Sequence, residues 1–399
     1  MPEEPANRAQ GSGIVKASMN SDFLVIGGGI AGLSAAASLS RHGRVTVIEA
    51  EEALGYHSSG RSVSFSHYGI GDAAVRGLTG WSRSFFERQP EGFCDTPVAT
   101  LSRSVYFATE EMLPALETLR AGMARFSAAI APIGPEELLA LCPVLRTGAG
   151  AAVAGLLDPT ALKLDADALL QSYARQVRKA GSEILTGRRI ARISEAGGRW
   201  TVESEDGARW SAPVLINAAG AWADKVAAMA GVRPIGLEPK RRTIIVVDPP
   251  AGTDFAGWPF VHSVAGDFYM LPEAGQLLVS PVDEVEDEAR DAQPEEYDIA
   301  LAAYQLEQYT TMAVPRIAHR WAGLRSFVAD RVPTAGFDGQ APGFFWLVGQ
   351  GGYGLQTAPA MAAAVEALTL GKAWPEGLAE VGVTAETIAP ARLFNGSAQ

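Results

Sequence analysis

The sequence contains only two cysteines, which limits the chemistry that the chain can perform through sulfur. Cys94 and Cys142 lie far apart and lack CxxC spacing, so they indicate neither a disulfide framework nor a metal site. We therefore expect no metal, and the chemistry must come from other groups.

Positive charge is also scarce, since 33 Lys and Arg residues stand against 45 Asp and Glu residues, for a net charge of −12. The longest basic cluster is Lys240-Arg241-Arg242, which fits a local anion site better than a track along a polyphosphate. Because an acidic chain repels nucleic acid and anionic membrane surfaces, no nucleic-acid partner is expected.

Long unbroken apolar runs are absent as well. The apolar stretch over residues 23–39 is interrupted by four glycines, and such a stretch makes a poor membrane span. Residues 1–20 are polar without an apolar signal core, so they predict a flexible tail, in which Met19 is an alternative start. With 47% hydrophobic and 20% charged residues, the composition is typical of a globular protein, and we expect a cytoplasmic one.

The first segment with recognisable chemistry is a βαβ unit. Phe23–Ile26 predicts a strand, Gly27–Gly32 follows with GxGxxG spacing, residues 33–41 predict a helix, and Arg44–Ile48 predicts a second strand that ends at Glu49. The glycines permit a tight turn, the helix start can receive a pyrophosphate, and the acid can accept from a ribose hydroxyl. A lone glycine motif is a weak signal, but the complete unit favours dinucleotide binding.

The loop that follows favours FAD over NAD as the cofactor. Residues 54–62 combine glycines with Ser58, Ser59, Ser62 and Arg61. Hydroxyl and backbone donors can wrap a pyrophosphate and a ribityl chain, and the arginine can neutralise phosphate charge. The alternative is a polar surface turn with a solvated arginine.

Two distant segments have similar features. The predicted strand at residues 214–217 ends in the small-residue bend 218–224, and the predicted strand at 344–348 runs into the glycine-rich turn 349–356, where Thr357 opens a helix. Such turns let the backbone approach a ligand and direct partial positive charge at it, here at the flavin edge. The alternatives are simple helix–strand packing and a structural turn.

The remaining periodicity predicts a helix over 158–178 and a set of strands, at residues 183–185, 189–193, 200–204, 243–247, 268–271 and 276–279. Asp206-Gly207 predicts a hairpin turn. The alternating strands between residues 234 and 327 predict an antiparallel sheet that forms a substrate domain. Among its polar residues we expect Arg241, Arg242, Tyr269 and Arg325 to lie against the flavin, above all Arg325, which is embedded in an apolar run.

In this order the segments resemble the D-amino-acid oxidase and glycine or sarcosine oxidase superfamily of flavoproteins, over the whole chain after residue 20. A closer resemblance to bacterial D-arginine dehydrogenases rests on five runs, at residues 55–62, 217–222, 239–242, 321–330 and 350–357. The resemblance implies an α/β fold, in which a Rossmann-type FAD-binding domain carries an interleaved antiparallel-sheet substrate domain. We assign the first domain to residues 21–105, 150–232 and 321–399, and the second to residues 106–149 and 233–320.

By the same resemblance, Arg242 and Arg325 hold a substrate carboxylate, Tyr269 flanks the substrate, and Gly352 and Gln356 line the site beside the flavin. Tyr68 replaces a lid tyrosine whose position is taken by Ile70. The residues expected around FAD are Gly27, Gly29, Ile30, Ala31, Gly32, Glu49, Ala50, Ser58, Ser59, Gly60, Arg61, Ser62, Ile190, Ala219, Gly220, Trp222, Gly351, Tyr353, Gly354 and Leu355.

The chain departs from that pattern at two further positions. Ser104 stands where the resembling enzymes have a carboxylate that grips a basic side chain, and Phe65 stands where they have a histidine, with His67 two residues away. The pocket would then lack the charge that selects arginine or lysine, so neutral substrates are expected to compete well.

The predicted reaction is oxidation of the CH–NH2 group of a D-amino acid by hydride transfer to flavin N5. Alternatives within the class are oxidation of sarcosine, glycine or other N-alkyl amino acids, or of a 2-hydroxy acid. A non-catalytic flavin carrier is the alternative from a different class. The electron acceptor, the oligomeric state and a covalent flavin link through His57 stay open.

Overall fold

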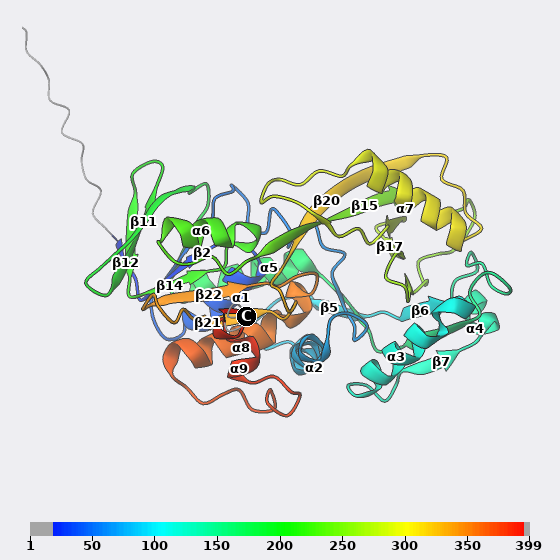
Figure 1. Ribbon diagram of the computed structural model, residues 1–399, viewed down its shortest axis with the longest axis horizontal. Helices are drawn as coiled ribbons and strands as arrows, with labels where there is room; N and C mark the ends of the chain where they lie inside the picture. The colour runs from blue at the N-terminus through cyan, green and yellow to red at the C-terminus, as the bar shows by residue number, and fades with distance from the viewer. Residues whose placement is uncertain (1–18, 395–399) are drawn as a thin grey trace, which may run out of the picture.

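The computed structural model describes residues 19–394 (Figure 1). Residues 1–18 of the predicted tail lie outside the described residues. Met19–Asn20 form strand β1, which pairs in parallel with β13 (Arg209–Ala212), so the prediction of a flexible tail is wrong for these two residues. No helix in the described part of the chain is long and apolar enough to cross a membrane.

A six-stranded sheet forms the centre of one half of the molecule, in the order β10-β3-β2-β14-β22-β21. Its strands are β2 (Phe23–Ile26), β3 (Val45–Ile48), β10 (Glu183–Leu185), β14 (Val214–Asn217), β21 (Thr334–Phe337) and β22 (Phe344–Val348). All pairs are parallel except β21 with β22. Ile26 pairs with Ile48 and Asn217, so the segments after these residues meet at one edge, where open α/β sheets bind ligands.

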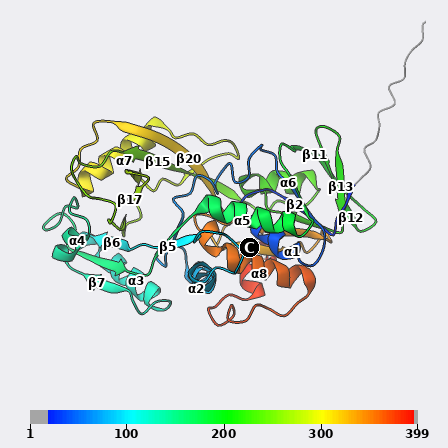
Figure 2. The same cartoon turned by 180° about the vertical axis from the view of Figure 1, so that it is seen from behind.

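Both faces of this sheet are covered, because alternate residues of β2 are buried on opposite sides. Phe23 and Val25 belong to a core shared with four helices, α1 (Ile30–Leu39), α2 (Ala73–Glu87), α5 (Ala166–Lys179) and α8 (Gly354–Leu370). Figure 2 shows α1, α5 and α8 on this side. Leu24 and Ile26 pack against α6 (Ala223–Met229) and a four-stranded sheet in the order β1-β13-β12-β11, with β11 at Ile190–Ala196 and β12 at Arg199–Ser204.

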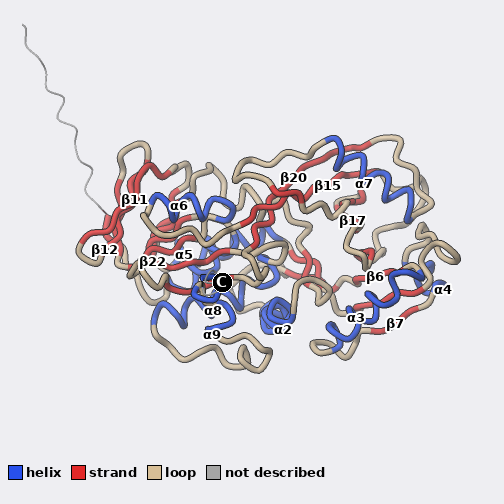
Figure 3. The backbone as a smooth tube through the Cα atoms, in the orientation of Figure 1, coloured by secondary structure: helices blue, strands red, loops and turns tan. Residues whose placement is uncertain are grey.

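A nine-stranded sheet forms the other half, in the order β19-β15-β18-β17-β16-β6-β8-β7 with β20 paired to β15. Its strands are β6 (Ser104–Ala108), β7 (Ala131–Ile133), β8 (Ala154–Asp158), β15 (Glu238–Val247), β16 (Phe260–Ser263), β17 (Tyr269–Glu273), β18 (Gln276–Ser280), β19 (Val285–Glu286) and β20 (Ile317–Phe327). The long strands β15 and β20 run from the first half out to α7 (Glu296–Tyr309), as the tube in Figure 3 shows. This arrangement confirms the predicted α/β fold class.

Several predicted elements are confirmed, and the starts of two helices are corrected. The hairpin turn lies between β12 and β13, with Gly207 at φ +79°. The helix predicted over 158–178 starts only at Ala166, because the residues before it form strand β9 (Leu162–Leu164). Asp165 caps the helix through a bond from the Ala168 amide (2.8 Å). The glycine-rich turn at 349–353 leads into α8 at Gly354 rather than at Thr357.

The remaining elements are a small sheet and several helices. Strand β9 (Leu162–Leu164) joins β4 (Phe65–Ser66) and β5 (Ala99–Leu101) in a three-stranded sheet. The others are α3 (Leu113–Ala124), α4 (Pro135–Leu141), α9 (Ala385–Ile388), α10 (Ala391–Phe394) and two 3-10 turns, at Glu110–Met112 and Gly220–Trp222. Strand β8 pairs with β6 in the nine-stranded sheet, although residues 150–232 were assigned to the FAD-binding domain. The predicted domain division otherwise stays a prediction.

Candidate active site

The turn between β2 and α1 packs directly onto the bend after β14. Gly27 has φ +110°, and a Cβ at this position would overlap the carbonyl oxygen of Ala218. A Cβ on Gly32 would in turn overlap the carbonyl oxygen of Gly27. Only glycine fits at both positions, so the two segments form one continuous floor at the edge of the sheet.

Glu49 stands at the end of β3 beside this floor. Its carboxylate accepts hydrogen bonds from the amides of Gly28 (2.6 Å) and Glu51 (2.8 Å), which fix its direction. We call the adjoining space the Glu49 cavity. Of the expected cofactor residues, it is lined by Gly27, Gly29, Glu49, Ala50, Ser58, Ser59, Ile190, Ala219, Gly220 and Trp222.

A second space, the central cavity, continues from the first, because both are lined by Gly29, Ser58, Ser59 and Gly220. Its walls also include the expected residues Ile30, Ala31, Arg61, Ser62, Gly351, Gly354 and Leu355. The first residues of α1 and α8, Ile30 and Gly354, both line it. Two helix N-termini thus contribute partial positive charge to one elongated site.

Four expected cofactor residues have other surroundings. Gly32, Gly60 and Tyr353 line neither cavity. The two glycines are close-packed, since a Cβ on Gly60 would come within 2.6 Å of the Gly55 carbonyl oxygen, and the Tyr353 hydroxyl donates to the Arg331 carbonyl. Arg61 lines the central cavity, but its guanidinium donates to the carbonyls of Ala292 (3.1 Å) and Ala322 (3.0 Å) and to Asp291 (2.6 Å). Because the chain itself pairs this charge, the structure does not support a phosphate-neutralising role for Arg61.

A third space, the chamber, opens beside the central cavity and has a volume of about 840 Å³. Arg242, Tyr269, Arg325, Gly352 and Leu355 line both spaces. The two arginines predicted to hold a carboxylate therefore stand at the boundary between the central cavity and the chamber. Strands β15 and β20, which carry them, are paired with Arg242 opposite Gly323 and Lys240 opposite Arg325.

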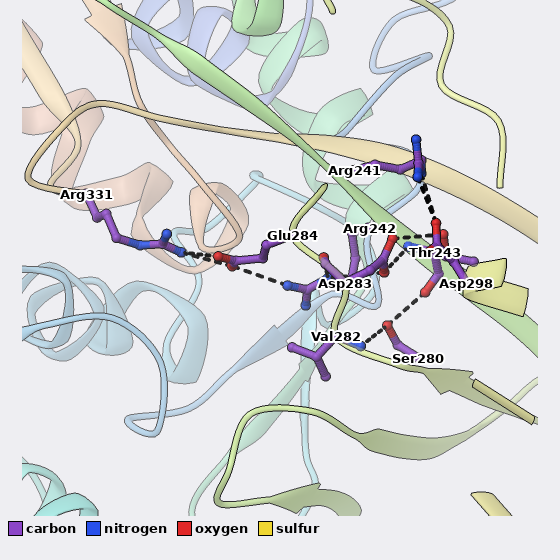
Figure 4. A network of polar contacts seen from close by, with 9 residues as sticks. All are labelled: Arg241, Arg242, Thr243, Ser280, Val282, Asp283, Glu284, Asp298 and Arg331. Carbon is purple, nitrogen blue, oxygen red and sulfur yellow. Dashed lines mark hydrogen bonds and ion pairs between the residues drawn. The ribbon is translucent and has the colours of Figure 1, made fainter. Parts of the chain in front are cut away.

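The two guanidinium groups differ in how they are satisfied. Arg242 is buried and donates through Nε to the Asp283 carbonyl (2.8 Å), while its Nη2 lies 3.3 Å from the Glu284 carboxylate, as Figure 4 shows. Burial and the neighbouring Arg325 lower the pKa of Arg242 to about 10, so it stays charged at neutral pH. Within residues 19–394, the Arg325 guanidinium has no hydrogen bond or ion pair, and it lies over Gly352.

The structure corrects two predicted placements. Arg241 points away from the cavities, because neighbouring residues of a strand face opposite sides; it pairs with Asp298 (2.9 Å) and Glu295 (2.8 Å). Tyr68 is buried, stacks on Phe126 with a centroid distance of 5.9 Å, and is not among the residues that line the chamber. The prediction that Tyr68 serves as the lid tyrosine is therefore not supported.

Comparison with known proteins assigns the chain to a family. The family of FAD-dependent oxidoreductases abbreviated DAO matches residues 22–368. The protein belongs to the DAO family. FAD is accordingly its cofactor, and the two joined cavities, with the Glu49 carboxylate at one end and two helix N-termini along the wall, fit an extended dinucleotide.

Relatives of this DAO-family protein are distant. The bovine (Bos taurus) FAD-dependent oxidoreductase domain-containing protein 1 is 24% identical over 396 residues, which cover 88% of this chain and 81% of the relative. L-proline dehydrogenase from P. horikoshii has a TM-score of 0.81 at 22% identity, with 96% of this chain and 100% of that chain covered. FAD-bound L-α-glycerophosphate oxidase from Mycoplasma pneumoniae has a TM-score of 0.78 at 22% identity, with 88% and 94% covered. These likenesses confirm the fold.

Buried polar groups of this DAO-family chain lie around the chamber. Tyr269 is 4% exposed, and its hydroxyl has no hydrogen-bond partner among the described residues; the Nε2 atom of His262 has none either. Gln356 is fixed by a bond from its Nε2 to Thr79 Oγ1 (2.7 Å) and accepts from the His67 amide (3.3 Å). Unpaired buried groups of this kind are costly unless a ligand satisfies them.

The chamber wall also contains a histidine–tyrosine pair. His67 Nδ1 and the Tyr106 hydroxyl share a hydrogen bond of 2.5 Å, and the ring of His262 stacks on Tyr106 at 4.6 Å. Burial, with smaller contributions from Arg325 and Arg76, lowers the pKa of His67 to about 3. Burial also lowers the pKa of His262. Both imidazoles are therefore neutral at neutral pH.

Several wall residues were not predicted from the sequence. Among them are Arg76, Tyr106, Phe260, His262 and Glu284 in the chamber, with Arg188 and Arg189 in the Glu49 cavity. None stands in a glycine-rich or otherwise marked run, so the sequence carries no signal for them. Ser104, which stands where the resembling enzymes have a carboxylate, is not on the chamber wall, and its buried Oγ has no partner among the described residues. His57 lines the Glu49 cavity, packs on Trp222 at 4.5 Å, and is not among the residues that line the chamber.

Proposed function

We propose that the protein oxidises the CH–NH2 group of an amino acid to an imine, with the D-enantiomer preferred, as the resemblance to D-amino-acid dehydrogenases implies. One observation carries the proposal: the Arg325 guanidinium has no partner within residues 19–394 and stands where the central cavity meets the chamber. A partly buried cation without a counter-ion is costly and is stabilised by an anionic ligand. A substrate carboxylate supplies that anion.

Arg325 is the first carboxylate-binding group in this proposal, and Arg242 supports it. The fork of a guanidinium binds a carboxylate through two parallel hydrogen bonds. Arg242 keeps Nε on the Asp283 carbonyl, and its Nη2 faces Glu284 only at 3.3 Å, so this group can still turn toward a substrate. The free hydroxyl of Tyr269 lies on the same boundary and adds a donor for the carboxylate.

The cofactor residues predicted from the sequence are proposed to hold FAD along the two joined cavities. Glu49 would bind the adenosine ribose, and the turn at residues 349–355 would lie at the flavin edge. Bound FAD supplies a hydride acceptor for the α-hydrogen of the substrate. The chain positions that substrate by its carboxylate, which fixes the reacting geometry without a covalent step.

The chain offers only a weak side-chain base for the substrate ammonium. The pKa of His67 is lowered to about 3, so this imidazole has little tendency to take a proton at neutral pH. The substrate therefore binds with a neutral amine. When the hydride leaves the α-carbon, the nitrogen lone pair forms the C=N bond, and the iminium proton is then released to water.

The fold neighbours are consistent with this proposal but do not distinguish it from oxidation of an alcohol. One neighbour is named for L-proline, an amino acid, and another for L-α-glycerophosphate, an alcohol. Oxidation of N-alkyl amino acids or of 2-hydroxy acids is therefore the second candidate, and a non-catalytic flavin carrier is the third. The amine is favoured because the resemblance to amine-oxidising flavoproteins extends over five separate runs of the sequence. The cytoplasmic location stays a prediction.

Product analysis tests the reaction. A primary amino acid should give equal amounts of the 2-oxo acid and ammonia, because water hydrolyses the imine that forms. An N-methyl amino acid that is oxidised at its α-carbon would release methylamine instead, and a 2-hydroxy acid would give the oxo acid without a nitrogen product. Formation of oxo acid from hydroxy acids alone would contradict the proposal and favour the second candidate.

A further inference from the structure

The chamber carries an excess of positive charge that binding of a single carboxylate does not explain. Three arginines line it, Arg76, Arg242 and Arg325, but within residues 19–394 Glu284 is the only Asp or Glu on its wall. Glu284 itself is already paired with Arg331, at 2.9 and 3.0 Å, outside the chamber-lining set (Figure 4). The two histidines of the wall are neutral because burial lowers the pKa of each.

Arg76 is the one of these three arginines to which the proposed reaction assigns no role. It comes from α2, and its Nε donates to the Tyr68 carbonyl (2.8 Å). Within residues 19–394 no carboxylate lies within ion-pair distance of it. Asp72, one turn earlier on the helix, uses its carboxylate to cap α2 through the Val75 amide (3.0 Å). The terminal nitrogens of Arg76 therefore remain available.

Arg76 and Arg325 come from different walls of the chamber. Arg76 lies against α3, where a Cβ on Gly122 would overlap its Nη1, and the α3 residues Ala115, Thr118 and Leu119 complete that wall. Arg325 comes from β20 and lies over Gly352. Figure 1 and Figure 2 both show α2 and α3 below β15 and β20. The charges of Arg325 and Arg76 both act on His67, since each contributes to the lowered pKa of this imidazole.

The space between these walls exceeds what a small amino acid needs. Its volume of about 840 Å³ falls in the range of pockets that hold drug-sized ligands. A substrate of only two or three carbons would leave Arg76 without a partner. A longer substrate can bring a second charged group to it.

We propose that the substrate carries a second carboxylate at the end of its side chain and that Arg76 binds this group, while Arg325 and Arg242 bind the α-carboxylate. The substrate class is then an acidic amino acid, such as the D-enantiomer of glutamate or aspartate. This inference rests on the proposed function for the reaction, but the placement of the two anion-binding groups stands independently of it. Arg76 is thus a specificity-determining residue.

The test compares the binding of glutarate and butyrate, which differ by one carboxylate. Neither has an α-amine, so the protein cannot oxidise them by the proposed reaction. The FAD-loaded protein is titrated with each, and binding is followed by perturbation of the flavin absorbance. Glutarate should bind at least about tenfold more tightly than butyrate, because it satisfies a second cation. Arg76→Gln should remove most of this preference, and Arg76→Lys should restore part of it.

Arg125→Gln is the matched control. Arg125 is an exposed cation next to α3 that does not line the chamber, so its removal changes the overall charge equally and should leave the preference for glutarate intact. FAD content and unfolding temperature, measured on every variant, show whether it folds. If Arg76→Gln does not fold, the preference for glutarate is compared between Arg76→Lys and the unaltered protein. Lysine keeps the charge but lacks the two-pronged guanidinium, so the preference should be smaller in this variant.

The inference is overturned if butyrate binds as tightly as glutarate, or if Arg76→Gln weakens both ligands equally. A purely structural role for Arg76 predicts that equal loss. Steady-state kinetics separate this inference from the proposed function. Preference for alanine over glutamate as a substrate would overturn the inference alone, whereas failure of every amino acid to react would overturn the proposed function while the glutarate preference could still be observed.

Discussion

Arg325→Ala is expected to lower kcat/KM for the amino-acid substrate by about 30- to 5,000-fold, which corresponds to roughly 2–5 kcal/mol. The substrate carboxylate would lose its main partner at the boundary between the central cavity and the chamber. Arg242 cannot replace the two-pronged donor of Arg325, because its own Nε is held by the Asp283 carbonyl. The protein should still bind FAD, since Arg325 has no hydrogen bond in the described residues that supports the fold. Steady-state kinetics and flavin absorbance measure the two effects.

Arg320→Ala is the matched control for this change. Arg320 lies on the same strand, is half exposed, and faces only Glu296 at 3.5 Å, so its loss should change kcat/KM by less than about twofold. Arg325→Lys should retain part of the binding, because a point charge replaces the two-pronged donor. Unaltered kinetics in Arg325→Ala would remove this residue from the site.

Gly27→Ala is expected to abolish most FAD binding and to destabilise the fold by roughly 2–4 kcal/mol, from backbone strain and overpacking together. The position has φ +110°, and a Cβ there would overlap the Ala218 carbonyl oxygen. The substitution would therefore push apart the β2–α1 turn and the bend after β14, which together form the floor of the cofactor site. Bound FAD per chain and the unfolding temperature are the measurements.

Gly339→Ala serves as the control for Gly27→Ala. Gly339 is exposed, has no positive φ, and no atom lies within 4 Å of a Cβ built on it, so alanine should be accepted with little change. If Gly27→Ala bound FAD as well as the unaltered protein, the close approach of these two segments would not be needed to form the cofactor site.

The cofactor half could be predicted from the sequence because its signals are local. The turn at Gly27–Gly32, the acid Glu49 at a strand end and the turn before α8 each combine a glycine pattern with a flanking strand or helix. Parallel strand pairing then brings all of them to one edge of the sheet. Arg325 was also predictable, since a lone charge in an apolar run requires a partner or a ligand.

The chamber could not be predicted in the same way, because its walls come from segments without local signals. Whether Arg241 or Arg242 faces the cavity depends on the register of β15, and a shift of one residue exchanges the two. Likewise, Tyr106, His262 and Arg76 meet only through the packing of β6, β16 and α2. The placement of Tyr68 likewise depends on packing that the sequence does not show, since its ring is buried against Phe126 and is not among the residues that line the chamber.

Anaerobic mixing of the FAD-loaded protein with single substrates tests the central claim most directly. The account predicts that amino acids bleach the long-wavelength absorbance of the flavin, D-enantiomers faster than L-enantiomers, and that 2-hydroxy acids of the same carbon skeleton do not. Because oxygen is absent, reduction is observed whatever the natural electron acceptor is. Bleaching by hydroxy acids alone, or by none of the D- and L-amino acids, would contradict the account.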